Sequence, residues 1–131
     1  MKIILKTCLA CLLLVVTAPA PAAHTYAQDR TTLTRRVQFG RGRTTAVIKN
    51  TIRRGTNHHY LLGARAGQTM IVHLVGKQTG FTVYTPDGGA AIEAADGVKD
   101  WEGTLPESGD YTIEIATDAR TAPYTLEVTI R

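Results

Sequence analysis

The sequence has few cysteines, few aromatic residues and almost no serine. Both cysteines of the 131-residue chain lie before Leu12, and Ser108 is the single serine. If these first residues are removed when the protein is exported, as argued below, the remaining chain contains no thiol. The sequence then excludes a thiol catalyst and a disulfide-stabilised miniprotein. Phenylalanine, tryptophan and tyrosine together make up 6% of the residues. So few rings disfavour a protein that stacks nucleic-acid bases, and we expect no nucleic-acid partner.

Long hydrophobic runs are also missing, and the first 27 residues have the pattern of a cleaved secretory signal peptide. Two lysines and an apolar run from Cys8 to Val16 precede a segment of small residues and prolines. Even when it is counted from Ile3 and across Lys6, the apolar stretch spans only about 15 residues, whereas crossing a bilayer takes roughly 20. We expect cleavage after Ala27, although Ala22 and Ala23 also fit. We also expect that the protein has no transmembrane span and that it is periplasmic or secreted.

After residue 27 the chain is short, and its charged residues are unevenly distributed along the sequence. Removing 27 of 131 residues leaves 104, which is one domain, and its 13 basic against 11 acidic residues give a charge of +2. Residues 28–54 contain eight basic residues and one acid, whereas the rest contains five basic residues and ten acids. Either the arginine-rich half binds anionic material, or the charges of the two halves pair on solvated strand faces.

Apolar residues alternate with polar ones from Arg35 to the end of the chain, and threonine, which suits exposed sheet surfaces, occurs 20 times. Turn signals recur about every 8–12 residues. This pattern predicts an all-β protein, an antiparallel β-sandwich or jelly roll of about eight short strands, over residues 35–131. Residues 28–34 lack the alternation and are expected to form a flexible leader. The residues expected to face inward are Ala46, Ile48 and Ile52; Tyr60, Leu62 and Ala64; Met70, Val72 and Leu74; Phe81 and Val83; Trp101, Gly103 and Leu105; Tyr111, Ile113 and Ile115; and Tyr124, Leu126, Val128 and Ile130.

No constellation typical of catalysis or metal binding stands out. Ser108 lies in a Pro-Glu-Ser-Gly-Asp turn rather than in a Gly-x-Ser-x-Gly elbow. His58 and His59 are neighbours on an expected strand, so their side chains point to opposite faces and cannot bind one metal ion together. The aspartates in turns match no calcium loop, and 104 residues leave little room for a sugar cleft. We expect no enzyme activity, no cofactor and no metal.

Two turn motifs have a physical explanation in the sequence alone. Gly67 and Gly109 permit tight turns between strands. Tyr111 follows Gly109 by two residues, so its ring can fold over the corner and its hydroxyl can find a backbone partner. These residues are expected to serve the architecture.

Four blocks of sequence resemble the bacterial pre-peptidase C-terminal domain family in order and spacing. They are Tyr60–Met70, Val83–Gly88, Leu105–Ile113 and Tyr124–Val128. The resemblance covers roughly residues 35–131, and it implies a β-sandwich.

Within that fold, the chain is most similar to the periplasmic inhibitors of goose-type lysozyme. The similarity lies in Val-Gln-Phe-x-x-Gly at residues 37–42 and in Leu-Pro-x-Ser-Gly-x-Tyr followed by Thr-Asp-Ala-Arg at residues 117–120. It implies that loops at one end of the sandwich enter a muramidase cleft. By this resemblance Arg120 and Asp118 would reach the catalytic carboxylates, and Tyr60 or His58 would border the contact.

A second function remains open from the charge distribution. The protein would then be a stand-alone module that attaches to anionic polysaccharide, peptidoglycan or lipid headgroups of the cell envelope. Candidate residues for the anionic ligand are Arg41, Arg43, Arg53 and Arg54. The oligomeric state is not indicated by the sequence under either function.

Overall fold

A computed structural model describes residues 31–131, and the predicted signal peptide lies outside the described residues. The described chain contains eight strands and one 3₁₀ turn, which confirms the all-β fold class. The elements are β1 (Thr32–Arg36), β2 (Thr45–Arg53), β3 (Asn57–Ala64), β4 (Thr69–Val75), β5 (Thr79–Tyr84), η1 (Glu93–Ala95), β6 (Asp100–Thr104), β7 (Gly109–Thr117) and β8 (Thr121–Ile130).

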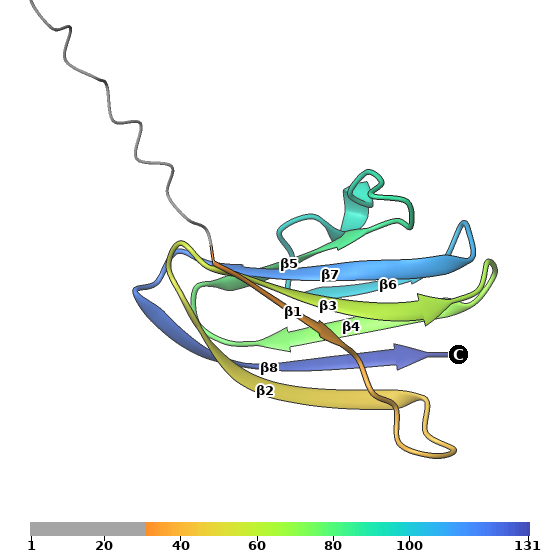
Figure 1. Ribbon diagram of the computed structural model, residues 1–131, viewed down its shortest axis with the longest axis horizontal. Coiled ribbons are helices and arrows are strands. Elements are labelled where there is room, and N and C mark those ends of the chain that lie inside the picture. Colours follow the sequence, from red (N-terminus) through yellow and green to blue (C-terminus); the bar gives the residue numbers. More distant parts are fainter. Residues whose placement is uncertain (1–30) are drawn as a thin grey trace, which may run out of the picture.

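The strands form two packed four-stranded sheets (Figure 1). Sheet A has the order β1-β3-β7-β5, and sheet B has the order β2-β8-β4-β6. Each strand is followed along the chain by a strand of the other sheet, as in a jelly roll. All neighbours are antiparallel except β1 and β3, which are parallel. Every connection therefore crosses between the sheets, and most turns gather at the two ends of the sandwich.

Strand β1 begins inside the segment that was expected to be a flexible leader. Thr32 pairs with Asn57, and the parallel register continues to Arg36 opposite Leu61. Four of the five β1 residues are exposed, so backbone pairing rather than burial holds the strand. An alternation pattern cannot reveal such a strand because it has no buried face. The boundary expected at residue 35 therefore moves to Thr32.

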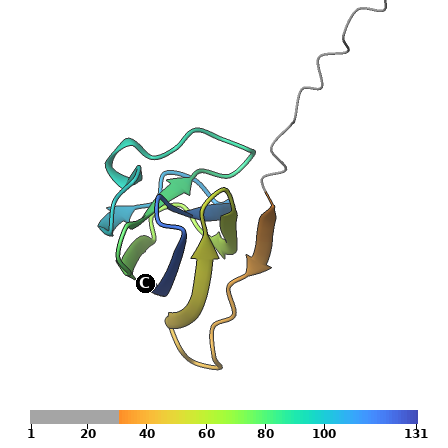
Figure 2. The same ribbon diagram turned by 90° about the vertical axis from the view of Figure 1, so that its left-hand side faces the viewer.

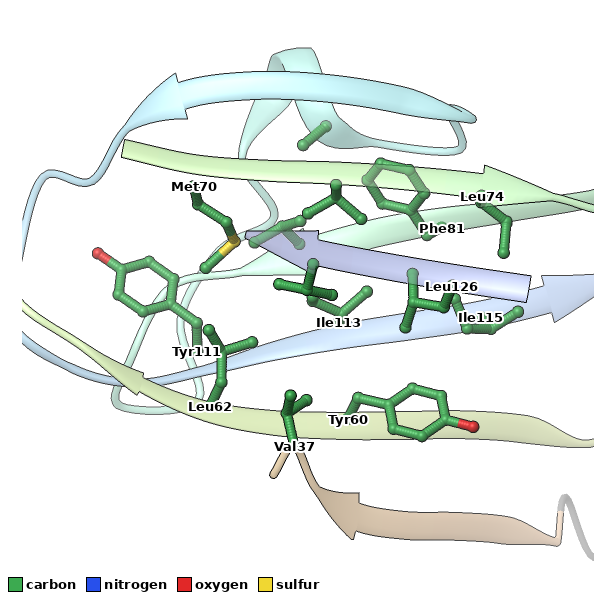
Figure 3. Close-up of a cluster of buried hydrophobic side chains, with 14 of the residues drawn as sticks. Val37, Tyr60, Leu62, Met70, Leu74, Phe81, Tyr111, Ile113, Ile115 and Leu126 are labelled. Atoms are coloured by element: carbon green, nitrogen blue, oxygen red, sulfur yellow. The ribbon is translucent and has the colours of Figure 1, made fainter. Parts of the chain in front are cut away.

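The core lies between the sheets and is built from the residues that alternate inward (Figure 3). Tyr111, Ile113 and Ile115 of β7 are fully buried, whereas Thr112 and Glu114 between them are partly exposed. Phe81 and Leu126 are also fully buried, and they come from opposite sheets. Each large apolar side chain of this kind contributes about 1.5–3 kcal/mol on burial. The period-two prediction of the core is confirmed, except that Ile48, Ala64, Trp101 and Ile130 are only partly buried and pack against its margin.

The corner before β7 has the predicted geometry. The Tyr111 hydroxyl donates a hydrogen bond to the carbonyl oxygen of Glu107 at 2.6 Å and accepts one from the Glu107 N–H at 3.2 Å. Gly109 has φ +146°, and a Cβ there would lie 2.8 Å from the Cβ of Pro86. Only glycine fits this turn, because a side chain would clash with the neighbouring loop.

The long connection from β5 to β6 returns along the edge of sheet A. Phe81 and Val98 exchange backbone hydrogen bonds of 2.8 and 3.1 Å, so the returning segment covers the outer edge of β5. A covered edge cannot pair with other chains. The same return places Lys99 beside Leu74, at the end of the sandwich where β4 turns into β5.

Candidate functional site

Three turns lie together at one end of the sandwich. They connect β2 to β3 (residues 54–56), β4 to β5 (76–78) and β7 to β8 (118–120). Figure 1 shows them at its left-hand side, and Figure 2 views the molecule from that end. We call residues 54–56, 76–78 and 118–120 the loop end. The β7–β8 turn at its centre contains two of the residues that the sequence singled out.

The β7–β8 turn separates its side chains between core and solvent. Ala119 is partly buried and packs against the hydrophobic core. Asp118 and Arg120 on either side of it are exposed. Because Ala119 anchors the middle of the turn, the two charged side chains both project away from the core.

Hydrogen bonds to both neighbouring turns hold the backbone of residues 118–120. The Thr117 hydroxyl and the Asp118 N–H donate to the carbonyl oxygen of Gln78, at 2.8 and 3.3 Å. On the other side, Arg54 donates from Nε to the Asp118 carbonyl at 2.8 Å and from its backbone N–H to the Arg120 carbonyl at 3.2 Å. A loop held in this way loses little conformational entropy when a partner binds it.

The charged groups of Asp118 and Arg120 do not pair with each other. Within residues 31–131, ion pairs join Arg36 to Asp110, Arg131 to Glu102, and two histidines to acids, and none of them involves the loop end. Nor does either side chain form a hydrogen bond in this part of the chain. Both side chains are therefore available to a partner.

The loop end is predominantly cationic. Its three turns contain Arg54, Lys77 and Arg120 against a single carboxylate, Asp118. Arg53, the last residue of β2, adds a further exposed cation. Among the seven basic residues between positions 35 and 54, only Arg36 forms an ion pair in the described structure. Few ion pairs therefore join the arginine-rich half of the chain to its acidic half. Most of these cations remain free for an anionic partner.

His58 and Tyr60 do not lie on the surface of the loop end. Tyr60 is 1% exposed and His58 is 7% exposed, and both pack between the sheets. The expectation that they border a partner contact is corrected: they lie beneath the turns. The alternating side-chain directions of β3 explain this, because His58, Tyr60 and Leu62 share the inward face.

A buried polar network joins these two side chains to sheet B. The Tyr124 hydroxyl lies 2.6 Å from His58 Nδ1 and 2.5 Å from the Tyr60 hydroxyl, which also accepts a 3.5 Å hydrogen bond from Asn50. Burial lowers the pKa of His58 below its usual value, and the charge of Arg35 lowers it further. Burial also raises the pKa of Tyr124. His58 and Tyr124 are therefore uncharged at neutral pH, and the network links the sheets next to the loop end.

Solved structures of known function have the same fold. PliG of Aeromonas hydrophila, a periplasmic lysozyme inhibitor of g-type lysozyme, matches with a TM-score of 0.70 and 35% sequence identity over 77% of this chain and 98% of that chain. The chain belongs to the PliG family. PliG of Salmonella Typhimurium (20% identity, TM-score 0.64, 76% and 98% covered) and a PliG mutant from Escherichia coli (17%, 0.64, 77% and 99%) share the fold. No protein-family model and no curated protein sequence matches.

In this PliG family member, the four arginines proposed for an anionic ligand do not form one patch. Arg53 and Arg54 lie at the loop end, whereas Arg41 and Arg43 lie in the connection before β2. Strand β2 is nine residues long and separates the two pairs by roughly 30 Å. The four candidates are therefore clustered in the sequence but not in space, and they could not all contact one small anionic ligand.

The remaining candidates for chemistry are accounted for structurally. The Ser108 hydroxyl accepts a 2.9 Å hydrogen bond from the Ala66 N–H and so joins two turns at the opposite end. His59 faces outward and pairs with Glu114 at 2.7 Å. In residues 31–131, no group of three or more His, Cys, Asp or Glu side chains converges on a point. No helix in this range is long and apolar enough to cross a membrane.

Sequence reasoning missed the positioning role of Arg54 in this PliG fold. The sequence indicates only its charge, whereas in the structure its guanidinium and backbone N–H both hold the β7–β8 turn. Arg54 and Asp118 are 64 positions apart. Only the tertiary arrangement, in which β2 and β8 are neighbours in full register from Thr45 to Arg53, brings them together.

Proposed function

We propose that this protein is a periplasmic inhibitor of a g-type lysozyme and that its loop end enters the muramidase cleft. The observation that carries the proposal is Arg120, exposed and without an ion pair in the described structure, on a turn that neighbouring turns hold by hydrogen bonds. The protein acts as a binding protein and not as an enzyme. Its expected export through the signal peptide of residues 1–27 agrees with a periplasmic location.

The chemistry of a muramidase explains why an arginine suits this position. Glycosidases use Asp and Glu side chains beside the bond that they cleave, so the cleft contains carboxylates. A guanidinium binds a carboxylate through two parallel N–H···O bonds, and inside a cleft this pair is shielded from water. Arg120 in that place would occupy the catalytic carboxylate and exclude the sugar chain.

Asp118 is proposed to complete the contact at the margin of the cleft. It projects from the same turn as Arg120 but carries the opposite charge, so it can pair with a basic side chain of the lysozyme. Tyr60 and His58 would support this contact from below, through the buried network with Tyr124. Because most of the loop end is cationic, an acidic cleft would also accelerate the encounter.

Inhibition of lysis tests the function. Purified protein without its first 27 residues is added to goose-, chicken- and invertebrate-type lysozymes acting on peptidoglycan, and the rate of lysis is followed. We expect competitive inhibition of the goose-type enzyme, seen as a raised KM with an unchanged kcat, because the loop and the sugar chain occupy one cleft. The absence of inhibition of any lysozyme at micromolar excess would refute the proposal.

Attachment to anionic envelope material is the weaker alternative, because its four candidate arginines lie at two distant ends of the sandwich. Strong, salt-sensitive binding to purified peptidoglycan in the absence of lysozyme would favour it instead.

The wider kinship with pre-peptidase C-terminal domains also remains a proposal. It is supported by the Gly109 turn and by the Tyr111 hydroxyl bonded to the Glu107 backbone.

A further inference from the structure

A groove with a volume of about 1110 Å³ adjoins the loop end. One wall is formed by residues 49–51 of β2, the floor by residues 121–125 of β8, and the opposite wall by residues 75–78, where β4 turns into β5. Lys99 and Ala119 complete the lining. The groove thus begins at the base of the β7–β8 turn and continues over sheet B.

The charged side chains that line this groove are all cationic. They are Lys49, Lys77 and Lys99, and no carboxylate is among the lining residues. The Lys99 ammonium donates a hydrogen bond to the carbonyl oxygen of Gly76, which ties it to the wall. Lys49 and Lys77 are exposed and form no ion pair within residues 31–131. Two free ammonium groups on opposite walls suit a ligand that presents carboxylates.

The surface between the lysines is apolar and contains no exposed aromatic ring. Val75 is 56% exposed and is one of two large hydrophobic residues in the described chain that are exposed to this extent. Pro123 is also exposed, whereas the ring of Tyr124 is buried. Sugar rings usually bind on exposed aromatic faces, so this lining favours a polypeptide segment that combines apolar and acidic side chains.

The groove shares residues with the loop end, so a partner that receives the loop end would also lie beside the groove. Ala119 lies within the β7–β8 turn and also lines the groove, and Thr121 follows directly after Arg120. A cleft that receives Arg120 must have a wall beside it, and on this side of the turn the wall would lie over the groove. We propose that the groove binds an acidic, partly apolar segment of the inhibited muramidase at the margin of its cleft. This inference rests on the proposed function.

The test compares two pairs of charge reversals in the secreted form of the protein. In the first variant Lys49→Glu is combined with Lys77→Glu. In the control Arg41→Glu is combined with Arg65→Glu, which makes the same change in net charge at exposed residues near the other end. Affinity and association rate for a goose-type lysozyme are measured by surface plasmon resonance at low and moderate salt. Circular dichroism and thermal unfolding confirm that both variants fold.

We expect the lysine variant to bind at least about tenfold more weakly and to lose most of the salt dependence of association. The control should stay within about twofold of the wild type, because its charges lie outside the contact. In addition, Val75→Ser should weaken binding without altering the salt dependence, because it removes only apolar contact.

The outcomes separate this inference from the proposed function. If the wild type inhibits, Arg120→Ala strongly weakens inhibition, and the lysine variant binds like the wild type, the groove proposal is overturned while the inhibitor function stands. Equal losses in the lysine variant and the control also overturn it, because only net charge then matters. If the wild type binds no lysozyme, both proposals fall.

Discussion

Replacement of Arg54 by alanine should weaken inhibition although Arg54 need not touch the lysozyme. Its side chain donates the 2.8 Å hydrogen bond to the Asp118 carbonyl, and alanine removes that bond. The backbone bond from residue 54 to the Arg120 carbonyl is independent of the side chain and remains. The bonds from Thr117 and Asp118 to Gln78 also remain. The variant therefore frees about one residue of the turn and not the whole turn.

The expected loss of inhibition follows from the one residue that the variant frees. Fixing the backbone of one residue costs about 1–2 kcal/mol, and the variant must supply this free energy when it binds. At 1.4 kcal/mol for each factor of ten, we expect an inhibition constant about 5- to 30-fold higher. The free energy of unfolding should change by less than about 1 kcal/mol, because the lost bond is exposed to water.

A lysis assay and thermal unfolding, performed on the same preparations, check this prediction. Arg53→Ala is the matched control, because Arg53 is the adjacent exposed arginine and its side chain forms no hydrogen bond to the turn in the described structure. Arg54→Lys keeps the charge but lacks the Nε–H group, so it should resemble Arg54→Ala. If Arg54→Lys inhibits like the wild type, or if Arg53→Ala is equally impaired, charge and not loop positioning explains the role of Arg54.

Two further predictions concern the scaffold. Tyr111→Phe removes the hydroxyl that bonds the Glu107 backbone twice and should destabilise the fold by about 1–3 kcal/mol in chemical denaturation, and an unchanged unfolding midpoint would contradict this. The pKa of His58 is lower in the folded than in the unfolded state, so the unfolded chain binds the proton more readily. The free energy of unfolding should therefore fall as the pH drops below about 6.5. His58→Asn should flatten this decline in melting temperature, whereas an unchanged slope would assign the decline to other groups.

The sandwich and its core could be predicted because burial has a period of two in nearly every strand. Tyr111, Ile113 and Ile115 alternate with partly polar residues, and all three are buried. Strand β1 escaped prediction because it is held by a parallel ladder with β3 and exposes most of its side chains. Such a strand leaves no trace in a hydrophobic pattern.

The candidate site was only partly predictable. Asp118 and Arg120 were found through a resemblance of local sequence, and the structure places both on an exposed turn. The same resemblance placed His58 at the border of the contact, but His58 lies on the inward face of β3, where its ring contacts the Tyr124 hydroxyl. The lysine-lined groove was missed because Lys49, Lys77 and Lys99 come from three separate elements. Convergence of this kind depends on tertiary structure and leaves no signal at any one position in the sequence.

The inhibition constant of Arg120→Ala against a goose-type lysozyme tests the central claim most directly. A buried arginine that pairs with a catalytic carboxylate typically contributes about 2 kcal/mol or more to binding, so the constant should rise at least about 30-fold. Arg65→Ala, which removes an exposed arginine at the other end, should leave it unchanged. An Arg120→Ala variant that inhibits within about twofold of the wild type would contradict the account, because the loop end would not then occupy the cleft.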